Sequence, residues 1–324
     1  MFKQMMTAAV AALGAMATVA APGMGVAAEI DRLALMAPAA PGGGWDGTAR
    51  SLQSAFTQSG IVKNVQVTNV TGAGGVIGLA NLVNNMKGDG KQLMIMGLVM
   101  TGAVLTNKSA VTLAQVTPIA RLTGEYEMIV VPANSPHKTM QDLVAALKKD
   151  PGAVSWGGGS AGGTDHILVG LIAKSVGVDP TKVNYIAHSG GGEAMANIMG
   201  GKVTAGVSGI GEFAGQVKAG RLRALAVSSP ARLPGVDTPT LKEGGVNVDL
   251  SNWRGIVAPP GLSDADKKAL VDVVTRVAKS KEWKAILEKQ DWTDLFLAGD
   301  DFAKFLREQD ESVAVTLKSI GLVQ

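Results

Sequence analysis

The chain has 324 residues, of which 46% are hydrophobic and 18% are charged, and its formal net charge is only +3. This balance is typical of a folded globular protein of about two domains and excludes a disordered chain. Lysine and arginine form no cluster interleaved with aromatic residues, so we expect no nucleic-acid partner. The sequence contains no cysteine, which excludes disulfides and thiol chemistry.

The first 28 residues have the order of a secretory signal peptide. Lys3 precedes an alanine-rich apolar run, and small residues follow that run up to Ala28. The run is short for a membrane-spanning helix, and the helix breakers Pro22 and Gly23 come directly after it. We therefore predict a signal peptide over residues 1–28, cleavage after Ala28 and a mature chain in the periplasm.

From residue 30 onward, short β-branched runs alternate with amphipathic stretches. This alternation predicts sheets with parallel strands, covered by helices on both faces. The expected strands cover residues 33–36, 65–70, 92–96, 128–131, 153–156, 183–187, 203–208, 222–227 and 253–258. After the last strand, Ser263 is expected to cap a helix, and two further helices are expected at about 282–289 and 301–319.

The final helices are expected to pack back on an earlier part of the chain, because few strands accompany them. We therefore predict a first lobe made of residues 29–124 plus 252–324, and an inserted second lobe made of residues 125–251. The strands near 125–131 and 252–258 would connect the lobes as a hinge.

Two glycine-rich stretches stand between a predicted strand and a predicted helix. They cover residues 41–50 (PGGGWDGTAR) and residues 155–165 (SWGGGSAGGTD). Glycine leaves the backbone N–H groups unshielded, and a following helix N-terminus adds partial positive charge, so each stretch predicts an anion site. Loops at the carboxyl ends of parallel strands open into one crevice, so we expect the two stretches to face each other across a cleft.

Two enzyme classes share parts of this pattern. Both stretches match the dinucleotide-binding glycine spacing, but neither unit places an acidic residue at the end of its second strand, which disfavours a nucleotide cofactor. The segment 158–162 (GGSAG) has the spacing of a nucleophile elbow, which makes a serine hydrolase using Ser160 the alternative function. Its catalytic histidine would be expected late in the chain, yet no histidine follows His188. The histidines also lack metal-ligand spacing, so we expect no metal and no cofactor.

Residues 41–46, followed by residues 72–78 (GAGGVIG), resemble the opening of the tripartite tricarboxylate transporter receptors, the Bug/TctC family. The resemblance spans nearly the whole mature chain, through residues 155–166, 185–201, 223–227, 239–245 and Trp253 with Gly255. It implies a two-lobe periplasmic-binding-protein-like α/β fold of type II, with mixed sheets flanked by helices and the ligand in the interlobe cleft. It also implies a monomeric receptor, not an enzyme, that delivers a small carboxylate to a membrane permease. Trp45 resembles the citrate-type branch, so citrate or another tricarboxylate is expected, with a dicarboxylate or an aromatic acid as alternatives.

In this interpretation one ligand carboxylate binds the first stretch, another binds the second, and a third loop closes below them. The predicted ligand-binding residues are Gly43, Gly44, Trp45, Asp46, Thr48, Gly74, Gly75, Ser160, Ala161, Gly163, Ser189 and Gly190. Two roles stay open at this point. Asp46 either caps the helix that follows it or contacts the ligand. Trp45 belongs either to the core or, as the glycine-rich setting favours, to the cleft wall.

Overall fold

Strands and helices alternate throughout the part of the chain that the computed structural model describes, residues 30–188 and 191–324. The strands are β1 (Arg32–Ala37), β2 (Asn64–Asn69), β3 (Gln92–Gly97), β4 (Thr117–Pro132), β5 (Ser155–Gly158), β6 (Asn184–Ala187), β7 (Ala205–Gly209), β8 (Leu222–Val227), β9 (Ser251–Ala258) and β10 (Thr293–Ala298). The predicted α/β class with mixed sheets is confirmed, because parallel and antiparallel pairs both occur.

The α-helices occupy the connections between the strands, together with short 3₁₀ turns such as Ala73–Gly75. They are α1 (Gly44–Gln58), α2 (Val76–Asn85), α3 (Leu98–Thr106), α4 (Met140–Lys149), α5 (Thr164–Ser175), α6 (Gly191–Met199), α7 (Ile210–Lys218), α8 (Asp264–Ala278), α9 (Lys281–Lys289) and α10 (Gly299–Ser319). Ser263 caps α8 as predicted, since its Oγ accepts a hydrogen bond from the Asp266 N–H at 3.1 Å. Among the described residues, no helix is both long enough and apolar enough to cross a membrane.

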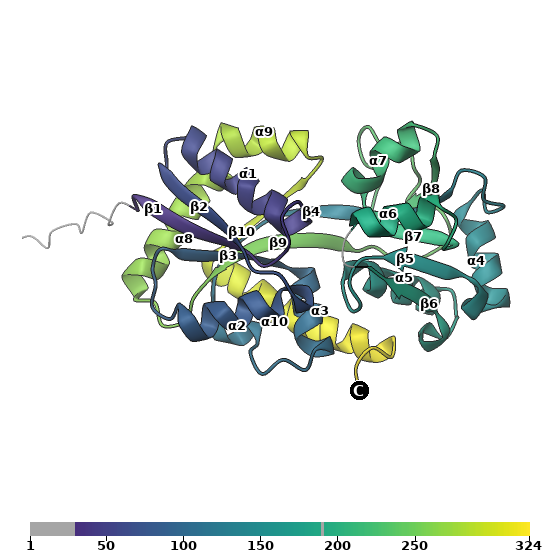
Figure 1. The fold of residues 1–324 in the computed structure, drawn as a ribbon, viewed down its shortest axis with the longest axis horizontal. Coiled ribbons are helices and arrows are strands. Elements are labelled where there is room, and N and C mark those ends of the chain that lie inside the picture. The colour runs from purple at the N-terminus through teal and green to yellow at the C-terminus, as the bar shows by residue number, and fades with distance from the viewer. Residues whose placement is uncertain (1–29, 189–190) are drawn as a thin grey trace, which may run out of the picture.

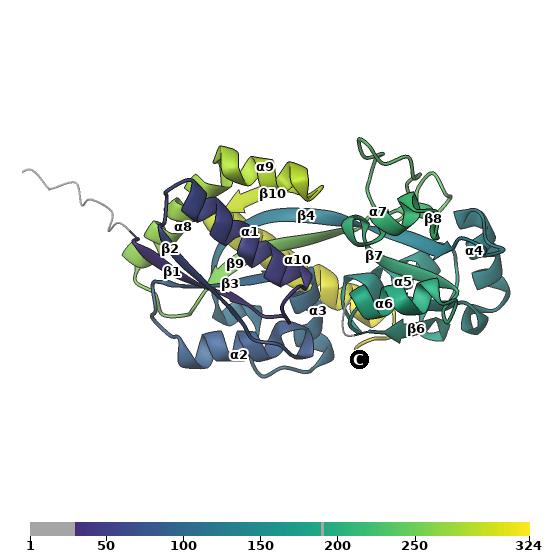
Figure 2. The same cartoon turned by 45° about the horizontal axis from the view of Figure 1, so that its top comes forward.

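One long strand, β4, joins two groups of strands. Its first half pairs antiparallel with β9 and β10, and its second half pairs antiparallel with β7 and β8. The resulting strand order is β2-β1-β3-β9-β4-β7-β5-β6. Figures 1 and 2 show β4 and β9 running through the middle of the molecule, between the two groups. The predicted lobe boundaries fall on this pair of strands, where Glu125 is the partner of Asn252, and they stay a prediction.

Helices cover both faces of the first group of strands. α1 packs with α8 and α9 on one face, and α3 packs with α2 and α10 on the other (Figure 1). The buried residues of this group lie between 33 and 122 and between 253 and 320, joined by Ile167 of α5. Separate hydrophobic clusters surround the second half of β4 with β5, β7 and β8.

Parallel pairing brings the glycine loops to common edges. β1 pairs in parallel with β2 and β3, so the loop before α1 and the loop before α2 leave the same edge of the sheet. β5 pairs in parallel with β6 and β7, so the loops that follow them also leave one edge. Loops at the carboxyl ends of such strands are the usual place of a ligand site in α/β folds.

Candidate functional site

The two glycine stretches line one cleft of about 820 Å³ between the groups of strands. Of the predicted ligand-binding residues, those that line this cleft are Gly43, Gly44, Trp45, Gly74, Gly75, Ser160 and Gly163. Asp46, Thr48 and Ala161 are not among its lining residues. Ser189 and Gly190 lie outside the described residues.

Asp46 holds the first glycine loop in place through hydrogen bonds. Its carboxylate is only 3% exposed and accepts hydrogen bonds from Gly42 N at 2.8 Å, Arg50 Nε at 3.0 Å and Asn69 Nδ2 at 2.9 Å. Burial alone would raise the pKa of Asp46, but the hydrogen bonds from Arg50, Gly42 and Asn69 outweigh it and lower that pKa to about 2. The carboxylate is therefore a permanent anion inside the loop, and α1 begins at Gly44 without a side-chain cap on Gly43.

Trp45 belongs to the hydrophobic core and also lines the cleft, so both of the roles considered for it apply. It is 8% exposed and packs within the first hydrophobic cluster. Gly74 and Gly75 lie beside it with φ of +61° and +92°, a left-handed backbone that suits glycine. A Cβ on Gly75 would lie 2.6 Å from the Trp45 ring, so the indole and this glycine form one continuous wall.

The second loop is held by side chains of α5 and β6. Asp165 Oδ2 accepts a hydrogen bond from Gly159 N at 2.6 Å, and Tyr185 donates its hydroxyl to Gly159 O at 2.9 Å. His166 stacks on Tyr185 with the ring centroids 4.0 Å apart, and its Nδ1 accepts from Gly162 N at 3.2 Å. Burial lowers the pKa of His166 to about 4, so this imidazole is neutral at physiological pH.

These contacts count against the serine hydrolase. The Nδ1 of His166 is occupied by the loop backbone. His188 is buried with its Nδ1 2.9 Å from Gly158 O and its Nε2 2.7 Å from Asn197 Nδ2, so both of its nitrogens are engaged with groups other than Ser160. Ser160 thus lacks the nucleophile–base hydrogen bond that a triad requires.

Charged residues that the sequence analysis missed line the same cleft. They are four acids and one base, namely Glu125, Glu127, Asp165, Glu212 and Arg254. The available signal was the segment 125–127 (EYE), because two glutamates two positions apart on a strand share one face. It stood next to the apolar run of β4 and could have marked a functional face.

The Arg254 guanidinium is bonded to neighbouring groups of the cleft wall. Its guanidinium is 6% exposed and forms an ion pair with Glu125. It also donates to Thr48 Oγ1 at 3.2 Å and to Gly44 O at 3.4 Å. Thr48 therefore positions Arg254 under the first loop, and the positive charge of the cleft is already balanced by one of its acids.

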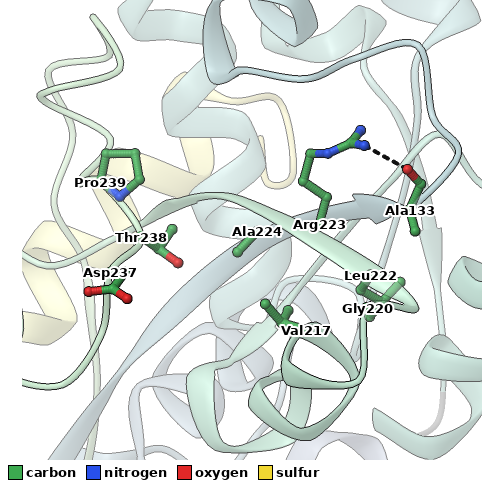
Figure 3. Close-up of a pocket in the computed structure, with 9 residues that line it drawn as sticks. All are labelled: Ala133, Val217, Gly220, Leu222, Arg223, Ala224, Asp237, Thr238 and Pro239. Atoms are coloured by element: carbon green, nitrogen blue, oxygen red, sulfur yellow. Dashed lines mark hydrogen bonds between the residues drawn. The ribbon is translucent and has the colours of Figure 1, made fainter.

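A second depression lies on the outer side of β8 and has a volume of about 450 Å³ (Figure 3). Arg223 lines this depression. Its guanidinium donates to Ala133 O at 2.7 Å and to the carbonyl oxygens of Ser135 and His137 at 3.2 Å. This arginine holds a turn of its own lobe, and the depression shares no lining residue with the cleft. We therefore place the candidate site in the cleft.

Comparisons with known proteins identify the family of the chain. The family model described as the tripartite tricarboxylate transporter family receptor matches residues 48–322. A protein of Agrobacterium vitis, encoded in the TAR-I ttuE–ttuC' intergenic region, is 31% identical over 258 residues, which cover 75% of this chain and 73% of the relative.

Solved structures share the fold over nearly the whole chain. A TctC solute binding protein from Polaromonas is 25% identical with a TM-score of 0.69, covering 89% of this chain and 98% of that one. MatC from Rhodopseudomonas palustris, solved with bound malate, is 21% identical with a TM-score of 0.76, covering 88% of this chain and 99% of that one. The chain thus belongs to the tripartite tricarboxylate transporter receptor family, whose members are periplasmic solute-binding receptors and not enzymes.

Proposed function

We propose that the protein captures a small carboxylate in this cleft and delivers it to the permease of a tripartite tricarboxylate transporter. One observation carries the proposal: two glycine loops, each followed by a helix that begins without a side-chain cap, line the same cleft. The first N–H groups of a helix have no acceptor within the helix, so α1 and α5 offer donors to an anion.

Neutral donors suit capture followed by release. A hydrogen bond to a charged group stabilises the bound ligand by roughly 1.5–3 kcal/mol, so several of them give micromolar affinity or better. We propose that residues 29–124 plus 252–324 and residues 125–251 close on the ligand as two lobes. Closure requires that the ligand bind the closed arrangement better than the open one.

The charges of the cleft narrow the choice of ligand. Trp45 and the family name favour citrate, but a trianion would face four acids with the single arginine already paired. MatC was solved with malate, a dicarboxylate. We therefore propose a ligand with one or two carboxylates and keep citrate as the competing candidate. We also propose export by a signal peptide cleaved after Ala28, which the intact mass of the secreted protein would check.

Thermal shift of the mature chain against citrate, malate, succinate, adipate and benzoate tests the function. We expect at least one carboxylate to raise the melting temperature, and isothermal titration to show binding without turnover. Ser160→Ala, which removes a hydroxyl from the cleft wall, should weaken that binding, whereas Ser312→Ala on the exposed side of α10 should not. Release of product from an activated ester, lost in Ser160→Ala, would instead support the hydrolase. A flat thermal response to every acid would contradict the proposal.

A further inference from the structure

Each glycine stretch contains one aspartate that accepts a hydrogen bond from a backbone N–H of its own loop, but the two aspartates are balanced differently. Asp46 is paired with Arg50, one helical turn further on, and with the amide of Asn69. The residue one turn after Asp165 is Val169, which is buried and apolar. The first loop therefore carries its own cation, and the second does not.

The residue beside Asp165 is a second acid, Glu127. Its side chain is fully buried and lines the cleft, and neither of its oxygens receives a hydrogen bond from the described residues. Both carboxyls line the same cleft, and Asp165 is among the charges that raise the pKa of Glu127. Its backbone is fixed by Ser228, which accepts from Glu127 N at 2.9 Å and donates its own N–H to Glu127 O at 2.8 Å. The backbone of Glu127 is therefore held in place on β4.

The other charged or titratable groups around this pair do not neutralise it. They come from four elements and are Glu125 of β4, Glu212 of α7, Arg254 of β9 and Tyr185 of β6. Arg254 is held by Glu125 and by the first loop. Burial, with repulsion from Glu212 and Glu125, raises the pKa of Asp165 to about 7. Burial, together with repulsion from Asp165, Glu125 and Glu212, also raises the pKa of Glu127. A buried acid without a partner costs stability unless something pairs with it.

We propose that Glu127 and Asp165 form an ammonium-binding subsite, so that the captured solute carries a cationic nitrogen in addition to its carboxylate. The inference rests on the proposed function, because the carboxylate of the same solute would occupy the first glycine loop. An ammonium group has three donors and no acceptor, which suits the Glu127 oxygens, since neither receives a hydrogen bond from the described residues. Within residues 30–188 and 191–324, histidine and acidic side chains form no group of three that could hold a metal ion, so an organic cation fits better.

The two ends of the cleft would then recognise opposite ends of one molecule. Residues 38–45 and 71–75 of the cleft lining are uncharged and rich in glycine, and the acids of the lining come from β4, α5 and α7. An amino-carboxylate placed across the cleft meets N–H donors with its carboxylate and the acid pair with its ammonium. The ammonium replaces the proton that the pair holds at neutral pH, so binding releases a proton and strengthens as pH rises.

Matched probes of equal length separate this idea from plain carboxylate capture. The pairs are β-alanine with malonate, 4-aminobutyrate with succinate, and 6-aminohexanoate with adipate. In each pair one carboxylate is kept and the other is replaced by an aminomethyl group, which carries the ammonium and keeps the number of carbon atoms equal. We expect an amino member to raise the melting temperature and its dicarboxylate partner to do so less. Titration calorimetry in two buffers of different ionisation enthalpy should show proton release on binding.

The decisive variant is Glu127→Gln, which keeps the shape and removes the charge. We expect it to bind the amino probe at least tenfold more weakly and to lose the proton release, while Glu308→Gln on the exposed face of α10 leaves both unchanged. Circular dichroism and an unchanged or higher melting temperature would show that the variant folds. Dicarboxylates that bind as tightly as the amino probes, with unchanged affinity in Glu127→Gln, would overturn the subsite and leave the receptor function standing. Binding of neither member of any pair would contradict the proposed function itself.

Discussion

Asp46→Asn tests whether the first glycine loop is held by its own carboxylate. The substitution keeps the size of the side chain and removes the charge that Arg50, Asn69 and the Gly42 N–H share. If Asp46 holds the loop in place, the variant loses stability at neutral pH. If Asp46 is instead a ligand contact, the variant keeps its stability and loses affinity.

The size of the loss follows from the pKa. The pKa of Asp46 falls from 3.8 to about 2, and at 1.36 kcal/mol for each unit this corresponds to about 2.5 kcal/mol. Solvent screens part of the attraction because the Arg50 side chain is 52% exposed. We therefore expect a loss of about 1–2 kcal/mol in the free energy of unfolding at neutral pH.

The pH dependence predicts in which direction the stability difference between the wild type and the variant changes. A lowered pKa means that the stabilisation is complete above the unfolded-state value near 4 and is lost as pH falls toward about 2. Urea unfolding of the wild type and Asp46→Asn should therefore show a gap at neutral pH that closes in acid. Glu311→Gln, a change in an exposed acid of α10, controls for generic surface effects. A gap of the same size at every pH would refute the electrostatic reasoning.

Two further outcomes are expected. The unliganded wild type should lose stability as pH rises from about 4 to about 7, because the raised pKa values of Asp165 and Glu127 mean that ionisation disfavours the folded state. Urea unfolding measures this loss; Glu127→Gln should flatten the profile, and a flat wild-type profile would contradict it. Gly102→Ala should weaken ligand affinity, because the added Cβ would overlap Gly162 O and displace the second glycine stretch. Gly215→Ala on α7, with no atom near its Cβ position, should leave affinity unchanged in calorimetry.

The strands were largely predictable because most are short apolar runs bounded by turn residues. β8 has the predicted bounds, and β1, β2 and β3 differ from prediction by a few residues at most. β4 was predicted too short, since only residues 128–131 form its continuous apolar run, and it begins at Thr117. The structure places Pro118 at a register shift, where a missing donor is tolerated. The predicted strand at 128–131 therefore lies in the second half of β4.

Other features lacked a local signal. The helix α3 was not predicted because its sequence is apolar on all sides, so it shows no amphipathic period although it is largely buried. The acid subsite was missed for a different reason. Glu127 and Asp165 come from separate elements, and only the fold brings them together. A glycine loop can be recognised from a local sequence pattern, but a cluster of residues that are distant in the sequence cannot.

The position of β9 has a consequence for the order in which the chain folds. β9 is hydrogen-bonded between β3 and β4, although its residues follow every strand of the second group in the sequence. During synthesis, the edge of β3 therefore stays open until most of the chain has emerged, while β4 to β8 can already pair among themselves. We expect the second group to form first and to present β4 as the template on which β9 completes the sheet. The late strand keeps the chain incompletely folded for longer, a state that suits transport across a membrane.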